Sequence, residues 1–150
     1  MRRRLFVLSA LCALAVSTAS ASASLTPLPG IRSPSGNITC LYVPGAQSMM
    51  LCAIATAEYA TRLQEKCMGR NGEGVDWHGF TLTATRAGLV NCTGGILYNP
   101  GTQRPHYVTL RYGASWRHGA FRCWSQITGV TCRNGARHGI FLARQSWRAW

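Results

Sequence analysis

Two short stretches of this sequence place a histidine directly after an arginine and before a glycine. They are Arg117-His118 and, twenty residues further on, Arg137-His138. Two histidines can act as general acid and base while an arginine holds phosphate, so a small ribonuclease-like phosphodiesterase is one interpretation. It requires the two histidines to meet in space. The pattern also suits two strand starts, in which glycine permits a bend and the phenylalanine that follows enters the core, and this interpretation is preferred.

Aromatic and basic side chains alternate in the last third of the chain. Arg122 and Trp124 share one face of a predicted strand, opposite Phe121 and Cys123. If the cystine faces inward, Arg122 and Trp124 are exposed neighbours that can hold a carboxylate or phosphate beside an aromatic surface. The same combination of residue types gives further candidate binding residues: Arg111, Trp116, Arg117, His118, Arg137, His138, Trp147 and Arg148. A place in the core is equally open for Trp124, and for Trp147 it is the preferred interpretation.

Other chemistries find little support. None of the six cysteines after residue 23 forms the C-x₂-C pairs of a zinc site, so neither a metal nor another cofactor is expected. Glycosidases need two positioned carboxylates, and Glu73 with Asp76 is only a weak pair in a glycine-rich stretch. No serine lies in a G-x-S-x-G context. The sequence therefore favours a protein without catalytic activity.

The charge of the chain is unevenly distributed. Its 150 residues include 16 Lys and Arg and only four acids, for a formal net charge of +12. Residues 77–150 contain nine arginines and no acid. A field of one sign attracts anionic glycopolymers, phospholipid headgroups or nucleic acid. The alternative is that the arginines only keep the surface soluble.

The N-terminus has the pattern of an export signal. Arg2–Arg4 are followed by an apolar run, Leu5–Val16, and by Ala21-Ser22-Ala23, which fits the A-x-A cleavage pattern. The run of about 12 residues is too short to span a bilayer, which takes roughly 20. We therefore predict a signal peptide over residues 1–23, a short leader over 24–32 and a single secreted domain over 33–150, in the periplasm, the cell wall or the medium.

A hairpin near the start of that domain fixes one disulfide by register. Residues 38–43 and 49–53 are rich in β-branched and apolar residues and flank a turn. If Val43 faces Met49, Cys40 falls opposite Cys52. Directly opposed strand residues are close enough for a disulfide.

A second hairpin fixes another disulfide. Its tight turn is Gln126–Gly129, and this register places Cys123 opposite Cys132. Cys67 and Cys92 then remain and pair by elimination. This sequential pattern is one of 15 connectivities that six cysteines allow.

The remaining elements complete a mainly β pattern. The one helical candidate covers residues 55–66, with Tyr59, Leu63 and Cys67 on one stripe. Further strands are expected over 77–84, 89–92 and 108–112, and residues 94–100 could add a short one. Many short strands with frequent turns predict a small antiparallel β domain, an open barrel or a sandwich, stapled by disulfides and carrying one short helix.

Five motifs occur in order along the chain. They are SPSGNI-x-C at Ser33–Cys40, YG-x-x-W at Tyr112–Trp116, G-x-F-x-C at Gly119–Cys123, GVTC at Gly129–Cys132, and HGI followed by Ala-Arg at His138–Arg144. Together they resemble a family of small secreted bacterial proteins of unknown function, over essentially the whole chain from Arg32 onward. The resemblance implies an extracytoplasmic, disulfide-bearing, β-rich domain, and it transfers no catalytic residue.

These observations favour a secreted, non-enzymatic binding or envelope-associated module. Its basic aromatic face would meet an anionic envelope polymer or a membrane surface. A protein partner stays open, nucleic acid is not expected for an exported chain, and the oligomeric state is left open. The alternatives are a small secreted hydrolase that uses histidine on a phosphodiester, and a protein inhibitor.

Overall fold

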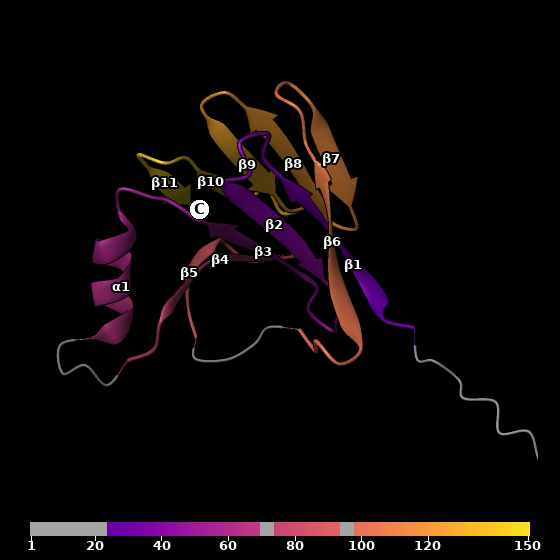
Figure 1. The fold of residues 1–150 in the computed structure, drawn as a ribbon, viewed down its shortest axis with the longest axis horizontal. Helices are drawn as coiled ribbons and strands as arrows, with labels where there is room; N and C mark the ends of the chain where they lie inside the picture. The colour runs from indigo at the N-terminus through magenta and orange to yellow at the C-terminus, as the bar shows by residue number, and fades with distance from the viewer. Residues whose placement is uncertain (1–23, 70–73, 94–97) are drawn as a thin grey trace, which may run out of the picture.

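Eleven strands and one helix make up the described part of the protein. The computed structural model describes residues 24–69, 74–93 and 98–150, so the predicted signal peptide, Glu73 and part of the predicted 94–100 strand lie outside it. The six-stranded sheet has the order β5-β4-β3-β2-β1-β6, and the five-stranded sheet has the order β11-β10-β9-β8-β7 (Figure 1). None of the described helices is long and apolar enough to cross a membrane.

The element bounds are as follows. The first sheet contains β1 (Thr26–Arg32), β2 (Ile38–Val43), β3 (Met49–Ile54), β4 (Trp77–Thr83), β5 (Leu89–Cys92) and β6 (Gln103–Thr109). The second contains β7 (Ser115–His118), β8 (Phe121–Gln126), β9 (Gly129–Arg133), β10 (Gly139–Leu142) and β11 (Trp147–Ala149). The helix α1 spans Ala60–Met68 and lies beside β4 and β5 (Figure 1). The prediction of a mainly β fold with one short helix is confirmed.

One hydrophobic core joins the two sheets. Met50 and Phe80 of the first sheet and Phe121 and Ile140 of the second belong to one buried cluster, each at most 1% exposed. The strands alternate inward and outward side chains as a half-buried sheet requires. The two sheets are hydrogen-bonded separately, so the fold is a two-layer sandwich and not a closed barrel.

All three predicted disulfides are present. The register places Cys40 opposite Cys52 and Cys123 opposite Cys132, as expected from the two hairpins. Cys67–Cys92 ties α1 to β5. The first two cystines meet in the core, where the Sγ atoms of Cys132 and Cys40 are 3.8 Å apart.

The expectation of a leader over residues 24–32 is wrong for most of that segment. Thr26–Arg32 forms β1, which is parallel to β6 along its whole length and antiparallel to β2 only at Gly30–Arg32. Pro27 and Pro29 suggested a break because they lack an N–H. They lie where only β6 pairs with β1, so no donor is needed on the other side.

Gly30 is required for the close packing of β1. A Cβ atom at this position would lie 2.7 Å from the carbonyl oxygen of Cys40 and 2.8 Å from the ring of Tyr107. Any larger residue would push β1 away from its two neighbours. The start of the domain is therefore an interior strand of the first sheet.

The helix begins five residues later than predicted. The backbone N–H groups of Ala55 and Thr56 donate to Asn37, and that of Glu58 donates to the carbonyl oxygen of Arg144. These donors are engaged with distant segments, so the chain enters the helix only at Ala60. The predicted buried stripe is correct: Tyr59, Leu63 and Cys67 are all buried.

The strand predicted over residues 108–112 is shifted. β6 ends at Thr109, and the chain then turns, with the N–H of Ala114 donating to the carbonyl oxygen of Arg111. Gly113 has φ 81°, a conformation that glycine adopts at little cost. This turn passes the chain from the first sheet to β7, the edge strand of the second.

Candidate functional site

The outer face of the second sheet carries the predicted basic and aromatic residues. Along β8, Phe121, Cys123 and Ser125 are buried, whereas Arg122 and Trp124 point the other way. This alternation is the one predicted from the strand period of two. Arg122 and Trp124 are therefore neighbours on the face that points away from the core.

Three arginines lie directly opposite one another on this face. Arg117 of β7 pairs with Arg122 of β8, which pairs with Arg133 of β9. Neighbouring strands are about 4.8 Å apart, so the three positive charges form a closely spaced row. Like charges opposite one another destabilise a sheet. Among the described residues the one ion pair joins Glu58 to Arg144. No carboxylate of the described residues therefore pairs with the three arginines of this row.

Tryptophan rings separate the guanidinium groups. The Arg122 guanidinium carbon lies 5.1 Å from the ring centre of Trp124, and that of Arg133 lies 5.9 Å from it. Arg133 also lies 5.5 Å from the ring of Trp150, and Arg148 lies 4.7 Å from the same ring. We name these five residues the arginine–tryptophan ladder. Each contact is within the range of a cation–π interaction.

Trp150 is held in place by hydrogen bonds to β10 and to the turn before it. Its indole N–H donates to the carbonyl oxygen of Arg137 at 3.1 Å, and its backbone exchanges two hydrogen bonds with Gly139. A Cβ atom at position 139 would lie 2.5 Å from the Trp150 ring, so glycine is needed for this close approach. The last residue of the chain is thereby held at one end of the ladder.

A cation–π contact does not use the N–H groups of an arginine as hydrogen-bond donors. A guanidinium beside a ring can therefore still bind carboxylate or phosphate with two hydrogen bonds. Two depressions open on this surface. One of about 410 Å³ is lined by residues that include Arg117, Arg122 and Arg137, and one of about 280 Å³ lies at Gln126 and Thr131; Trp124 and Arg133 line both.

The structure brings together six of the predicted site residues. Arg122, Trp124 and Arg148 belong to the ladder, Arg117 continues its row of charges, and Arg137 lines the larger depression. The sixth is His138, whose backbone N–H donates to Asn134 Oδ1 in the turn that carries Arg137.

The other predicted residues lie elsewhere. Trp116 and Trp147 pack against the core, so the place preferred for Trp147 is confirmed. The ring of His118 lies 4.4 Å from that of Tyr42 and stacks on Trp116 at 5.6 Å. Arg111 is exposed in the turn after β6 and does not line either depression.

Two ladder residues were missed. Arg133 could have been found, because the register that pairs Cys123 with Cys132 also places Arg133 opposite Arg122. Trp150 could not, because its position depends on the pairing of β10 with β11, and β11 was not predicted.

The two histidine motifs are not structurally equivalent. Arg117-His118 ends β7, while Arg137-His138 lies in the turn before β10. Phe121 is buried but Phe141 is half-buried, so the expectation of two equivalent strand starts is wrong. The ring contacts of His118 are with Tyr42 and Trp116, and no contact joins it to His138 in the described part of the chain.

One cluster of sulfur atoms has the spacing of a metal site. The Sγ atoms of Cys40, Cys52 and Cys132 lie within 4.8 Å of one another in the core. All three belong to disulfides and so offer no thiolate.

Comparisons with known proteins add no further assignment. No family model matches this chain, and neither a curated protein nor a solved structure is similar enough to count as a match. The fold and surface define the class: a disulfide-stapled β-sandwich with a basic aromatic sheet face. Its three disulfides suggest an oxidising, extracytoplasmic environment.

Proposed function

We propose that the protein is a secreted, non-enzymatic binding module whose arginine–tryptophan ladder holds an anionic polymer of the cell envelope. The observation that carries this proposal is the row formed by Arg117, Arg122 and Arg133, three cations opposite one another with no carboxylate partner among the described residues. The predicted signal peptide and the three disulfides support an extracytoplasmic location, which is where envelope polymers occur.

The energetics of the row favour an anionic ligand. Each pair of like charges directly opposite one another on neighbouring strands opposes folding. Stacking on Trp124 and Trp150 offsets part of this cost. Carboxylate or phosphate groups bound along the row neutralise the remaining repulsion. The arginine row that lowers the stability of the free protein therefore raises its affinity for an anionic ligand.

Co-sedimentation of oxidised residues 24–150 with an envelope fraction tests the proposal. We expect retention at low salt that is lost at high salt, because contacts between arginine and polyanions weaken steeply with ionic strength. The double variant Arg122→Gln with Arg133→Gln should lower retention about tenfold or more, since it removes two charge-assisted contacts.

The matched control is Arg62→Gln with Lys66→Gln. Both residues are exposed on α1, outside the ladder, so this variant removes the same two charges without touching the face. Its retention should equal that of the unmodified protein. Retention of the ladder variant at the level of the control, or no retention at either salt concentration, would contradict the proposal.

A further inference from the structure

A third depression, lined by polar groups, lies beyond the end of β8. It has a volume of about 400 Å³ and lies where four segments meet: the loop 33–38, Thr56, the β8–β9 turn and residues 143–145. Tyr112 completes its lining. We name it the end hollow. None of the proposed ladder contacts uses it.

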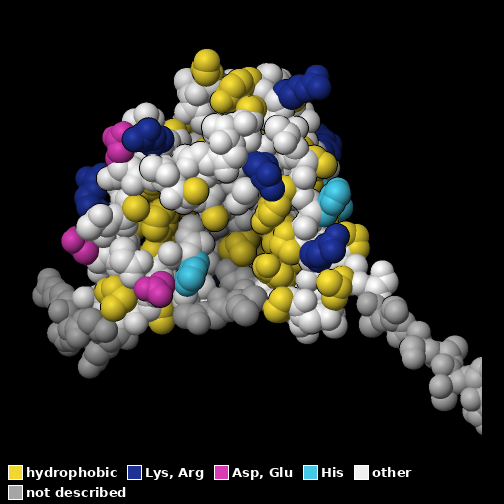
Figure 2. Space-filling model, viewed as in Figure 1, with side chains coloured by type: hydrophobic (Ala, Val, Ile, Leu, Met, Phe, Trp, Pro, Cys, Tyr) yellow, Lys and Arg dark blue, Asp and Glu magenta, His cyan; other side chains and the backbone are white. Residues whose placement is uncertain are grey.

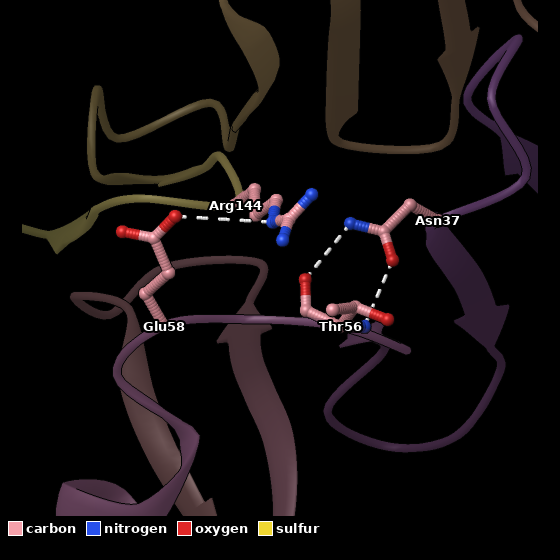
Figure 3. A network of polar contacts seen from close by, with 4 residues as sticks. All are labelled: Asn37, Thr56, Glu58 and Arg144. Atoms are coloured by element: carbon pink, nitrogen blue, oxygen red, sulfur yellow. Dashed lines mark hydrogen bonds and ion pairs between the residues drawn. The ribbon is translucent and has the colours of Figure 1, made fainter.

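The floor of the end hollow is held by hydrogen bonds between distant segments. The side chain of Asn37 donates to the carbonyl oxygen of Thr56 at 3.0 Å and accepts from its N–H at 2.8 Å. Arg144 Nε lies 3.8 Å from Glu58 Oε1, and its guanidinium lies between Glu58 and Asn37 (Figure 3). These contacts fix the loop carrying the SPSGN motif against the chain before α1.

The rim of the end hollow has polar groups without partners. In the described part of the chain, the side chains of Gln126, Thr128 and Gln145 make no hydrogen bond, and neither does the hydroxyl of Tyr112, a residue 50% exposed. Amides and hydroxyls both donate and accept, as the hydroxyls of a sugar do. The Tyr112 ring adds an aromatic surface beside them. This chemistry suits a carbohydrate better than a simple anion.

The end hollow is continuous with the ladder. Gln126 lines both the end hollow and the depression of about 280 Å³, which shares Trp124 and Arg133 with the depression of about 410 Å³. Arg122, Trp124 and Gln126 all project from the outer face of β8. At about 3.3 Å per residue, Arg122 and Gln126 are about 13 Å apart along the strand. The three depressions therefore form a row along β8.

We propose that the three depressions are subsites of one track along β8, and that its ligand is a linear anionic glycan. Acidic groups of the chain bind the guanidinium edges of the ladder, and hydroxyl groups further along enter the end hollow. This inference rests on the proposed function and narrows its ligand. A flat lipid surface would touch the ladder only, and polyphosphate has no hydroxyls for the amides of the end hollow.

Oligogalacturonates of defined length provide the test. We expect the affinity of the hexamer for oxidised residues 24–150 to exceed that of the trimer about tenfold or more, because a longer chain occupies linked subsites. This ratio is taken after correction for the several trimer segments that one hexamer contains. In amide NMR spectra, trimer and hexamer should both shift residues 122–124 and 131–133. Only the hexamer should also shift residues 127, 128 and 145.

Variants separate the two parts of the track. Thr128→Ala combined with Gln145→Ala should lower hexamer affinity several-fold and leave trimer affinity and polyphosphate binding unchanged. Both positions are exposed, so the fold is retained, and Thr61→Ala on α1 is the matched control. Salt-sensitive binding of all polyanions, with shifts confined to the ladder, would overturn the track and leave the proposed function standing. No binding of any polyanion would overturn both.

Discussion

Asn134 joins the two sheets through a single side chain. Its amide nitrogen donates to the carbonyl oxygens of Thr83 and Arg86 at 2.9 Å, and its Oδ1 accepts from the N–H groups of Ala136 and His138 at 3.0 Å. The first two contacts reach the β4–β5 connection of the other sheet. The hydrogen bonds to Ala136 and His138 close the turn that carries Arg137. One side chain therefore holds this turn, beside the ladder, against the first sheet.

Tyr59 makes the stability of the protein sensitive to alkali. Its ring is 2% exposed and its hydroxyl has no hydrogen-bond partner, and burial raises its pKa from 10.0 to about 12. Because the folded pKa exceeds the unfolded one, this contribution to stability is complete below pH 10 and is lost as the pH rises toward 12.

Tyr59→Phe should therefore flatten the alkaline part of the stability curve. The variant has no phenol to ionise, and it also removes a buried hydroxyl that lacks a partner, so at neutral pH we expect its stability to equal or exceed that of the unmodified protein. Urea unfolding at pH 8 and pH 11 measures this, with the half-exposed Tyr112→Phe as control. An equal alkaline loss in the Tyr59 variant would rule out this origin.

The β8–β9 hairpin is the element whose integrity the ladder needs most. Cys123→Ala with Cys132→Ala should lower the melting temperature by about ten degrees, because releasing a loop this short costs about 2–3 kcal/mol. Both cysteines are replaced because a lone Cys132 thiol would lie 3.8 Å from Cys40 and could attack the neighbouring disulfide.

Calorimetry of the double variant measures this change. The variant without the Cys67–Cys92 bridge is the comparison, since it also lacks one disulfide but keeps the hairpin bridge. In the first variant, polyanion affinity should fall together with stability. A melting temperature that stays unchanged would mean that the hairpin does not depend on its cystine.

Local elements were predictable from sequence, and long-range pairings were not. The two hairpins have their turns and alternating residues within about a dozen positions, so their registers and disulfides followed from the strand period. β1 gave no such signal, because its partner β6 lies more than seventy residues away and Pro27 and Pro29 indicated a break. β10 and β11 have four and three residues, too few for a periodic pattern.

The same limit applies to the candidate site. Arg122 and Trp124 were predicted because one strand contains both. The ladder as a whole needs Trp150 beside Arg133, a contact that exists only once β10 and β11 are added to the sheet. The helix start was missed for a related reason, since the donors before Ala60 bind residues far away in the chain.

Charge is separated across the whole molecule. The three described acids gather around α1: Glu65 lies in it, Glu58 precedes it, and Asp76 accepts a hydrogen bond from Gln64. Asp and Glu side chains accordingly lie on the α1 side in Figure 2. The ladder belongs to the other sheet. Arg62 and Lys66 on α1 offset these acids, so the positive field is strongest at the ladder, and a polyanion is attracted there in preference to the helix side before contact.

The three disulfides differ in their exposure, and this predicts the order of their reduction. Cys40, Cys52, Cys123 and Cys132 are each 0% exposed, whereas Cys92 is exposed. A thiolate must reach a sulfur atom to attack it. In native buffer with a mild dithiol, we expect Cys67–Cys92 to open first while the other two bridges persist until the protein unfolds.

Alkylation at timed intervals followed by mass spectrometry gives this order. Urea is the control, because unfolding exposes all six cysteines and should remove the difference between the bridges. Opening of a core bridge before Cys67–Cys92 in native buffer would contradict this prediction. It would mean that the two sheets separate readily enough to admit the dithiol.

The meeting of two cystines in the core also makes wrong cysteine pairing possible while the chain folds. Four sulfur atoms converge there. The Sγ atoms of Cys40 and Cys132, which belong to different bridges, lie 3.8 Å apart. Hairpins form within about microseconds, and each hairpin register holds a cysteine opposite its own partner. Cys40 and Cys132 become neighbours only when the two sheets pack. Thiol oxidation that occurs before the sheets pack therefore forms the two native bridges.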